Sequence, residues 1–161
     1  MNKKIHIREA KQEDMHAVLQ LIHELAVFEK EPNAVDITEN TLIEAALGSS
    51  PSIFCFVAEV DALIVGTAIA YFRFSTWKGK TVHLEDLIVT QSMRGKGIGE
   101  SLYNKVLHFA EGQGAKRVEW VVLDWNKGAI DFYKKSGATI LKDWNLVQMD
   151  EIELKAYLNK K

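Results

Sequence analysis

Residues 91–99 read QSMRGKGIG and lie between a strand-like run, Val82 to Val89, and a helical pattern that includes Ile98. Glycines at every second position leave backbone amides that no side chain covers. Those N–H groups, together with the positive end of the following helix, form a cradle for a pyrophosphate group. Arg94 and Lys96 add positive charge beside it. The segment therefore predicts a strand, an anion-binding loop and a helix in direct succession.

The spacing of these glycines excludes two common nucleotide-binding motifs. A dinucleotide-binding loop has the pattern Gly-x-Gly-x-x-Gly, and the third glycine of this chain, Gly99, comes one residue early. A P-loop ends in Gly-Lys-Ser/Thr, whereas Gly99 is followed by Glu100 and Ser101. The simpler alternative to an anion site is a glycine-rich turn before a capped helix, with no ligand.

The composition is that of an ordinary globular protein. The chain has 161 residues, 47% hydrophobic and 26% charged, which suits one domain with a buried core. A net charge of −2 gives no electrostatic reason to expect nucleic acid as a partner. No apolar run is long enough to span a membrane, and no signal-peptide core is present. With one cysteine, Cys55, and scattered histidines, no metal site is expected. These features predict a cytoplasmic protein.

Hydrophobic periodicity and turn residues predict a mixed α/β fold with helices on both faces of the sheet. The expected helices cover Val18 to about Glu29, Thr38 to Gly48, Ile98 to Gly112, Asn126 to about Ser136, and Glu151 to Leu158. The expected strands cover Ile5 to Ile7, Ile53 to Val60, Leu63 to Phe74, Val82 to Val89, Val118 to Val122, and Leu146 to Met149. Asp61 and Ala62 should form a tight turn between two of these strands.

A second group of candidate residues lies on the helix that begins near Asn126. Asn126, Ile130 and Tyr133 are spaced so that they share one helical face. Asn126 is a favoured N-cap, and Tyr133 beside Phe132 could simply be a packed aromatic residue. The functional alternative makes the Tyr133 hydroxyl a proton donor directed at a cofactor, with Asn126 holding cofactor or solvent nearby.

The glycine loop resembles the acyl-coenzyme A loop of the GNAT N-acetyltransferases, usually written Gln/Arg-x-x-Arg-Gly-x-Gly-x-Gly/Ala. The matching residues are Gln91, Arg94, Gly95, Gly97 and Gly99. A closer resemblance, over about residues 5–160, is to the subgroup of diamine (spermidine/spermine) and thialysine acetyltransferases. It rests on LAVFE at 25–29, Trp-x-Gly-Lys at 77–80, HLEDLIV at 83–89, and DWN at 124–126 followed by FYKK at 132–135.

This resemblance implies a fold and a cofactor. The implied fold is the GNAT α/β fold, a single domain over residues 1–161 with a mixed, mostly antiparallel sheet of about six to seven strands flanked by helices on both faces. The implied cosubstrate is acetyl-CoA, with no metal, and the implied assembly is a homodimer. Leu87 and Val89 match strand positions whose backbone pairs with the pantetheine arm. The pyrophosphate cradle corresponds to Arg94, Gly95, Gly97, Ile98 and Gly99.

The resemblance also implies roles in catalysis and in binding the amine. Tyr133 matches the general acid of the family, and Glu85 matches a carboxylate that relays the proton from the amine. Glu29 and Trp77 match residues near the amine substrate. Elementary chemistry requires a proton acceptor, because a primary amine with a pKa of about 10.4 arrives protonated and must lose a proton before it attacks. Both substrates can then react directly in a ternary complex. Without the resemblance, Glu85 could be only a solvated carboxylate.

Three positions depart from the polyamine-acetylating pattern. Ser75 stands where those enzymes carry an acidic residue, and Leu141 and Lys142 replace acidic residues near the C-terminal tryptophan. A polycation needs several carboxylates, so a lysine-like or thialysine-like amine is as plausible an acceptor as spermidine. Two further alternatives stay open: acetylation of protein amines, and a non-catalytic module that senses acyl-CoA. Retention of both Glu85 and Tyr133 favours the enzyme.

Overall fold

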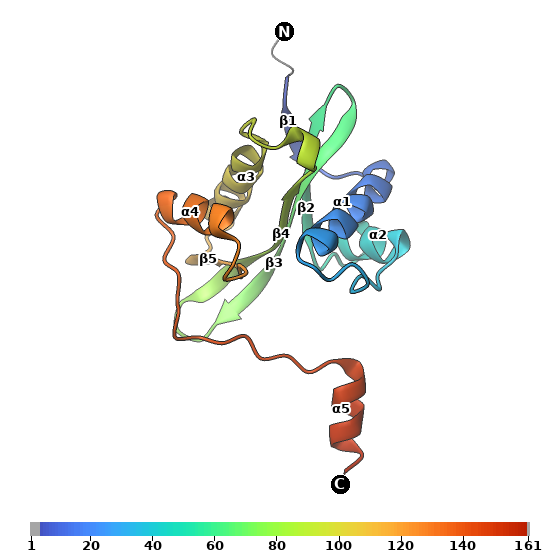
Figure 1. Cartoon of the computed structure of the whole chain (residues 1–161), viewed down its shortest axis with the longest axis vertical. Coiled ribbons are helices and arrows are strands. Elements are labelled where there is room, and N and C mark those ends of the chain that lie inside the picture. The colour runs from blue at the N-terminus through green and yellow to red at the C-terminus, as the bar shows by residue number, and fades with distance from the viewer. Residues whose placement is uncertain (1–3, 161) are drawn as a thin grey trace. The chain divides into compact units, whose positions relative to one another are not determined.

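The computed structural model describes residues 4–160, and the chain divides into two compact units, Met1–Val121 and Val122–Lys161. The first unit contains one five-stranded sheet in the order β1-β2-β3-β4-β5 (Figure 1). Its strands are β1 (His6–Glu9), β2 (Phe54–Val60), β3 (Leu63–Ser75), β4 (Gly79–Val89) and β5 (Arg117–Glu119). Neighbouring strands are antiparallel except β4 and β5, which are parallel. The predicted mixed, mostly antiparallel sheet is therefore confirmed.

Helices cover both faces of this sheet. Figure 1 shows α1 (Met15–Phe28) and α2 (Glu39–Leu47) on one face and α3 (Ile98–Gly112) on the other. Successive residues of β2 point to opposite faces. Cys55 and Val57 belong to a buried cluster that includes residues of α1 and α2. Phe54 and Phe56 instead contact Phe109 of α3, with ring centroids 4.5 and 5.5 Å apart. Both faces of β2 are apolar for this reason.

Several of these elements begin or end where caps and turn residues in the sequence predicted. The Thr38 side chain caps α2, because its hydroxyl accepts a hydrogen bond from the Thr41 N–H at 3.2 Å. Asp61 and Ala62 have φ angles of 51° and 62°. Positive φ at both central residues is typical of the two-residue turns that match the twist of antiparallel strands. That turn joins β2 to β3.

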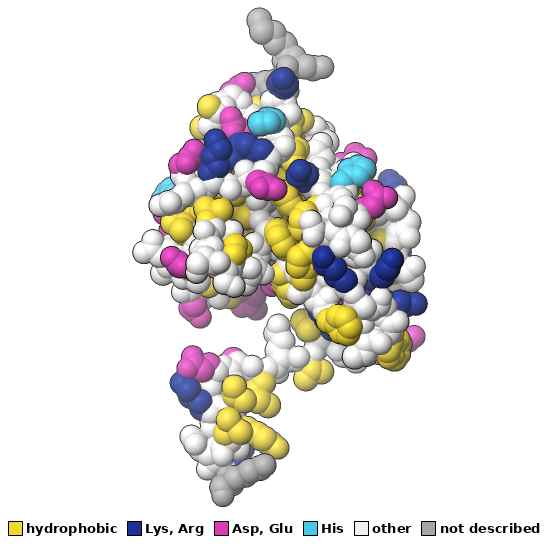
Figure 2. Space-filling model, turned by 180° about the vertical axis from the view of Figure 1, so that it is seen from behind, with side chains coloured by type: hydrophobic (Ala, Val, Ile, Leu, Met, Phe, Trp, Pro, Cys, Tyr) yellow, Lys and Arg dark blue, Asp and Glu magenta, His cyan; other side chains and the backbone are white. Residues whose placement is uncertain are grey.

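The second unit contains two helices. Helix α4 (Lys127–Lys135) begins at the Asn126 cap, and α5 (Glu151–Leu158) begins at Asp150, whose carboxylate accepts from the Glu153 N–H at 2.7 Å. Apolar side chains of α5 and of the segment before it are exposed, and Figure 2 shows such side chains at the surface. None of the described helices is long and apolar enough to cross a membrane.

The sheet has fewer strands than predicted. We expected about six to seven, and the described residues form five. The expected strand at Leu146 to Met149 is absent from the structure, and β5 is shorter than the expected Val118 to Val122. Apolar, β-branched composition favours a strand, but a strand also needs a hydrogen-bonding neighbour. No described strand pairs with residues 146–149, and Val147 is 86% exposed.

Candidate active site

The predicted anion-binding loop connects β4 to α3. A short 3-10 turn, η2 (Gln91–Met93), leads into Gly95 and Gly97, which have φ angles of 75° and 77°. Residues other than glycine rarely adopt this left-handed backbone conformation. A Cβ atom at either glycine would meet no protein atom within 4 Å, so the space in front of the loop is open. The backbone can therefore approach a ligand closely at both positions.

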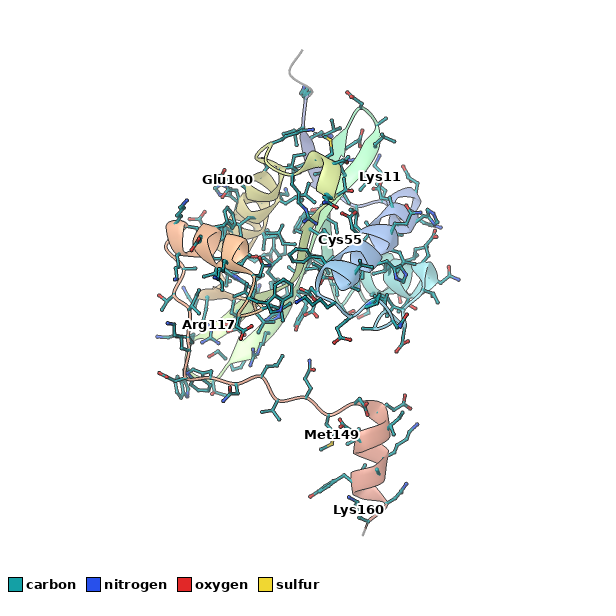
Figure 3. The ribbon with its side chains drawn as sticks, in the orientation of Figure 1. Lys11, Cys55, Glu100, Arg117, Met149 and Lys160 are labelled. Atoms are coloured by element: carbon teal, nitrogen blue, oxygen red, sulfur yellow. The ribbon has the colours of Figure 1, made fainter. Side chains whose placement is uncertain are left out.

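The N-terminus of α3 lies directly behind this loop. Gly97 is the N-cap, and the first intrahelical hydrogen bond runs from the Ser101 N–H to the Gly97 carbonyl at 3.0 Å. The N–H groups of Ile98, Gly99 and Glu100 have no partner within the helix and point out of its positive end. Figure 3 labels Glu100, an exposed residue of this first turn. The arrangement is well suited to bind a phosphate or pyrophosphate group.

One edge of β4 is hydrogen-bonded to a neighbouring strand over only part of its length. β4 pairs with β3 along most of its length, but with β5 only from Thr81 to His83. Beyond His83, the described strands leave the second edge of β4 unpaired as far as Val89. Leu87 and Val89, the predicted partners of the pantetheine arm, lie on this stretch. An extended chain with amide groups could hydrogen-bond to such an edge.

A bulge on β4 sets the position of Glu85. Asp86 lies opposite Ile69, and the next pair joins Leu84 to Ala70, so Glu85 has no partner on β3. Bulges are common next to active sites because they redirect a side chain. The Glu85 side chain is 53% exposed, and its carboxylate lies 3.6 Å from Nε2 of His83. From Glu85 to Val89 the strand spans about 13 Å.

Three carboxylates gather near this bulge. Burial, followed by the charges of Glu85 and Glu29, raises the pKa of Asp86 to about 6. Partial burial also raises the pKa of Glu29, which follows the last residue of α1. A cation close to like-charged carboxylates stabilises their ionised forms. The charges of the predicted residues Glu29 and Glu85 therefore both act on Asp86.

Several polar side chains around Glu85 were not among the predicted site residues. The ring of His83 packs on Tyr71, with centroids 5.0 Å apart. Burial and the charge of Glu85 raise the pKa of Tyr71. Nδ1 of His83 is buried without a hydrogen-bond partner among the described residues, and it lies 3.8 Å from the Glu119 carboxylate. Asp86 was foreseeable as the direct neighbour of Glu85, but Tyr71 and Glu119 come close only because both are paired with His83 on neighbouring strands.

Within one copy of the chain, Trp77 lies far in space from the carboxylates of Glu85 and Asp86. It lies in the turn between β3 and β4 and is 80% exposed. Between Gly79 at the start of β4 and Glu85 the strand covers about 20 Å. Ser75, which replaces an acidic residue of the polyamine pattern, stabilises this turn, because its hydroxyl accepts hydrogen bonds from the N–H groups of Trp77 and Lys78 at 3.2 Å.

Asn126 and Tyr133 belong to the second unit, whereas the glycine loop belongs to the first. The Asn126 side chain accepts a hydrogen bond from the Ala129 N–H at 3.2 Å, so it caps α4, which is the simpler of the two roles considered for it, and its part in cofactor binding stays a prediction. Tyr133 lies seven residues further along α4, on the same helical face. Its ring is 5.3 Å from that of Phe132, measured between centroids.

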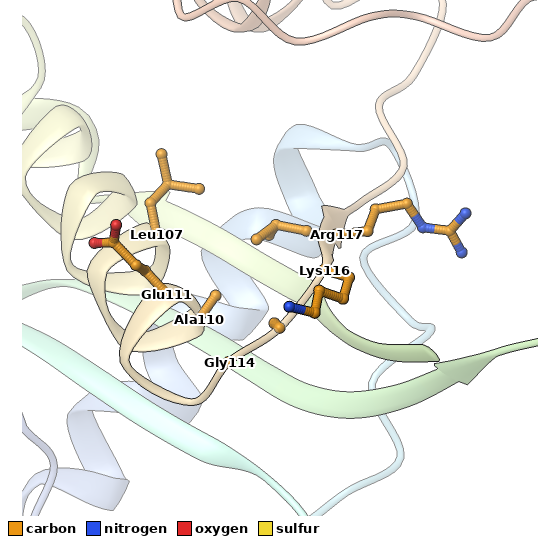
Figure 4. A pocket seen from close by; sticks show the side chains of 8 residues that line it. Leu107, Ala110, Glu111, Gly114, Lys116 and Arg117 are labelled. Carbon is orange, nitrogen blue, oxygen red and sulfur yellow. The ribbon is translucent and has the colours of Figure 1, made fainter. Parts of the chain in front are cut away.

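A hollow of about 390 Å³ lies at the opposite end of α3 from the glycine loop (Figure 4). Glu111, Lys116 and Arg117 contribute charged side chains to its lining. The fifteen residues of α3 separate the two ends of this helix by about 22 Å. The hollow is therefore separate from the glycine loop. No three His, Cys, Asp or Glu side chains in the described part of the chain are grouped so as to hold a metal ion.

Comparisons with known proteins agree with these features. Residues 15–138 match the acetyltransferase (GNAT) family. The chain is 41% identical over 145 residues to thialysine N-epsilon-acetyltransferase from Bos taurus, covering 85% of each protein. It is 33% identical over 158 residues to spermidine/spermine N(1)-acetyltransferase-like protein 1 from Homo sapiens, covering 92% of this chain and 23% of that longer protein.

The fold is also similar to that of solved acetyltransferases. The structure of the aminoglycoside N-acetyltransferase AAC(6')-Iy in complex with CoA has a TM-score of 0.74 and 15% sequence identity, covering 92% of this chain and 96% of that one. GNAT acetyltransferases use acetyl-CoA, which fits the open glycine loop and the helix N-terminus of this chain. The chain belongs to the acetyltransferase (GNAT) family, and it is an acetyltransferase enzyme.

Proposed function

We propose that this enzyme transfers the acetyl group of acetyl-CoA to the terminal primary amine of a lysine-like amino acid of the thialysine type. The observation that carries the proposal is the bulge on β4, where Glu85 and Asp86 lie on the strand that leads into the glycine loop, while the charge of Glu29, just after α1, acts on Asp86. Two of the carboxylates that would attract an ammonium ion and the groups that would hold a pyrophosphate thus belong to one continuous segment, to which the end of α1 adds Glu29.

The proposed cofactor site uses the loop and the free edge of β4. The pyrophosphate would be held by N–H groups and positive charge from Arg94, Gly95, Lys96, Gly97, Ile98 and Gly99. Leu87 and Val89 would pair through their backbone with the pantetheine arm. When bound, the cofactor supplies an acetyl thioester. Support comes from the positive φ of the two loop glycines and from the β4 edge that the described strands leave unpaired.

The carboxylate cluster would bind and deprotonate the amine. An ammonium group near Glu29, Asp86 and Glu85 gains Coulomb attraction and relieves the mutual repulsion of the three carboxylates. Glu85 would then accept the proton of the ammonium, either directly or through water. Its side chain is 53% exposed, so it can release that proton to solvent after each turnover. The neutral amine is the nucleophile.

Tyr133 is proposed as the general acid that protonates the thiolate of the leaving group, and Asn126 as a residue that helps to hold the cofactor. A phenol hydroxyl can donate a proton to a thiolate as the carbon–sulfur bond breaks. The family match, which includes residues 126–133, supports both assignments. The same match extends from the first compact unit into the second, as far as residue 138, which supports the proposal that residues 1–161 form one domain.

The amino-acid acceptor is favoured over a polyamine by one observation at the hairpin turn. Ser75 makes hydrogen bonds to two backbone N–H groups there, and no carboxylate takes its place beside Trp77. A polyamine carries two or more ammonium groups, each of which gains from a carboxylate of its own. The bovine relative is named for thialysine, a lysine analogue with one side-chain amine. The human relative, named for spermidine and spermine, makes polyamines the second candidate.

We further propose that the enzyme is a cytoplasmic homodimer that uses neither metal, nucleic acid nor membrane. The exposed aromatic side chains of Phe74 and Trp77 at the end of the β3–β4 hairpin support the dimer, because they extend from the sheet without cover within the first unit. In a dimer, Trp77 would be available to the amine site of the partner, which is how it could serve as a substrate-binding residue.

The experiment measures thiol release from acetyl-CoA with thialysine, lysine, putrescine and spermidine offered in parallel. The proposal expects saturable turnover, fastest with thialysine or lysine, and a loss of kcat of about a hundredfold in Glu85→Gln. Glu111→Gln is the control, because its carboxylate is exposed on the far end of α3. Preference for spermidine would assign a polyamine acceptor. Tight binding of acetyl-CoA without turnover of any amine would favour a protein acceptor or a sensor.

A further inference from the structure

A carboxylate on α1 contacts the start of the glycine loop. Oε1 of Glu24 accepts a hydrogen bond from the Gln91 N–H at 2.8 Å, and the same oxygen lies 3.7 Å from Nη2 of Arg94. Glu24 and Gln91 are far apart in the sequence, and the contact links α1 to the segment between β4 and α3. About one third of the Glu24 side chain is exposed, so the contact is only partly screened by water.

Arg94 is held on three sides by groups of the protein itself. Its Nε donates a hydrogen bond to the Val89 carbonyl at 2.8 Å, and its guanidinium lies 5.3 Å from the centre of the Phe28 ring. Together with Glu24, these groups fix the side chain at the base of the loop. Arg94 therefore connects the end of β4, α1 and the first glycine of the loop.

We propose that Glu24 is a positioning residue for the cofactor, which acts by holding the backbone of Gln91 and the side chain of Arg94 in place. The inference rests on the proposed binding of acetyl-CoA at the glycine loop. Glycine gives this loop the freedom to approach a pyrophosphate, and the same freedom raises the entropy lost when the loop is ordered. A fixed anchor at Gln91 reduces that loss before the cofactor arrives.

The hydrogen bond and the charge of Glu24 have opposite effects on an anionic ligand. The bond to the Gln91 N–H orders the loop, whereas the negative charge offsets part of the positive charge of Arg94. Three variants separate the two effects. Glu24→Gln keeps an oxygen acceptor and removes the charge. Glu24→Asp keeps the charge but is one methylene shorter, so it cannot make the same bond. Glu24→Ala removes both.

The test combines isothermal titration calorimetry of the 161-residue chain with acetyl-CoA and steady-state kinetics. We expect the Kd and KM for acetyl-CoA to rise about tenfold in Glu24→Ala and Glu24→Asp. Glu24→Gln should bind at least as tightly as the wild type. In all three variants, kcat at saturating acetyl-CoA and the KM for the amine should stay within about twofold of the wild type. Glu111→Ala, on an exposed site, controls for loss of a surface carboxylate.

Wild-type affinity in Glu24→Ala, or equal weakening in Glu24→Gln and Glu24→Ala, would overturn the positioning role. A fall of kcat and of the unfolding temperature in all three variants alike would also overturn it, because Glu24 would then only stabilise the fold. Absence of acetyl-CoA binding by the wild-type protein would overturn the proposed function as well as this inference. Binding by the wild type with no change in the three variants would overturn this inference alone.

Discussion

Glu29, just beyond the end of α1, and Asp86, on β4, lie close enough in space for their charges to interact, although they are far apart in the sequence. Burial and the charge of Glu85 raise the pKa of Asp86, and the charge of Glu29 raises it further, to about 6. Such a shift costs stability whenever the carboxylates are ionised and no cation is bound. An ammonium group bound nearby, as the proposed function expects, would reduce this cost.

Asp86→Asn should make the free protein more stable at neutral pH. The folded protein binds the Asp86 proton more tightly than the unfolded chain, so wild-type stability falls as pH rises from about 4 to about 6. The gain in Asp86→Asn should therefore be near zero below pH 4 and reach at most about 3 kcal/mol above pH 6.5. Urea unfolding across this range measures it, with the exposed Asp131→Asn as control. A gain that does not vary with pH would contradict the assignment.

Tyr133→Phe should lower kcat by about a hundredfold or more, because the variant loses a proton donor and keeps the aromatic ring. The affinity for acetyl-CoA should change little. Stopped-flow thiol release and calorimetry with acetyl-CoA measure the two quantities separately. Tyr157→Phe, which removes an exposed hydroxyl from α5, is the matched control. If Tyr133→Phe turned over like the wild type, another group would have to protonate the thiolate.

Gly97→Val should weaken acetyl-CoA binding by at least tenfold. Gly97 has a φ of 77°, which costs other residues about 1–2 kcal/mol, and the added side chain would occupy the open space in front of the loop. Calorimetry gives the affinity, and thermal unfolding gives the cost to stability. Gly112→Ala, at the other end of α3, has open space around its Cβ and no positive φ, so it should bind normally. Undiminished affinity in Gly97→Val would show that the loop is not the cradle.

Cys55 should not react with thiol reagents in the folded protein. It lies in the interior between the sheet and α1 (Figure 3), and burial raises the pKa of its thiol to about 11. Only about one thiol in a thousand would be ionised at pH 8. Ellman's reagent should therefore detect no thiol in native protein and one per chain in guanidinium chloride. Cys55→Ala should keep full activity. Rapid labelling of the native protein would contradict this burial.

The glycine loop, the helix caps and the two-residue turn could be predicted from the sequence because each depends on residues close together in the chain. Asn126 caps α4 and Thr38 caps α2 as expected, through bonds to residues three positions away. The expected strand at residues 146–149 failed for the converse reason. The apolar residues of this segment favour a strand. A strand also needs a neighbouring strand for its hydrogen bonds, and the composition of the segment does not say whether one is present.

The sequence by itself determined the family, the glycine loop and the identity of the candidate catalytic residues, since these are short patterns of residue types. Only the tertiary structure decided how Glu85 is placed, because its bulge arises from the pairing register of β3 and β4. The same holds for the contact of Glu24 with Gln91 and for the shifted pKa of Asp86. Each depends on atoms brought together from distant parts of the chain, where distance and burial set the interaction energy.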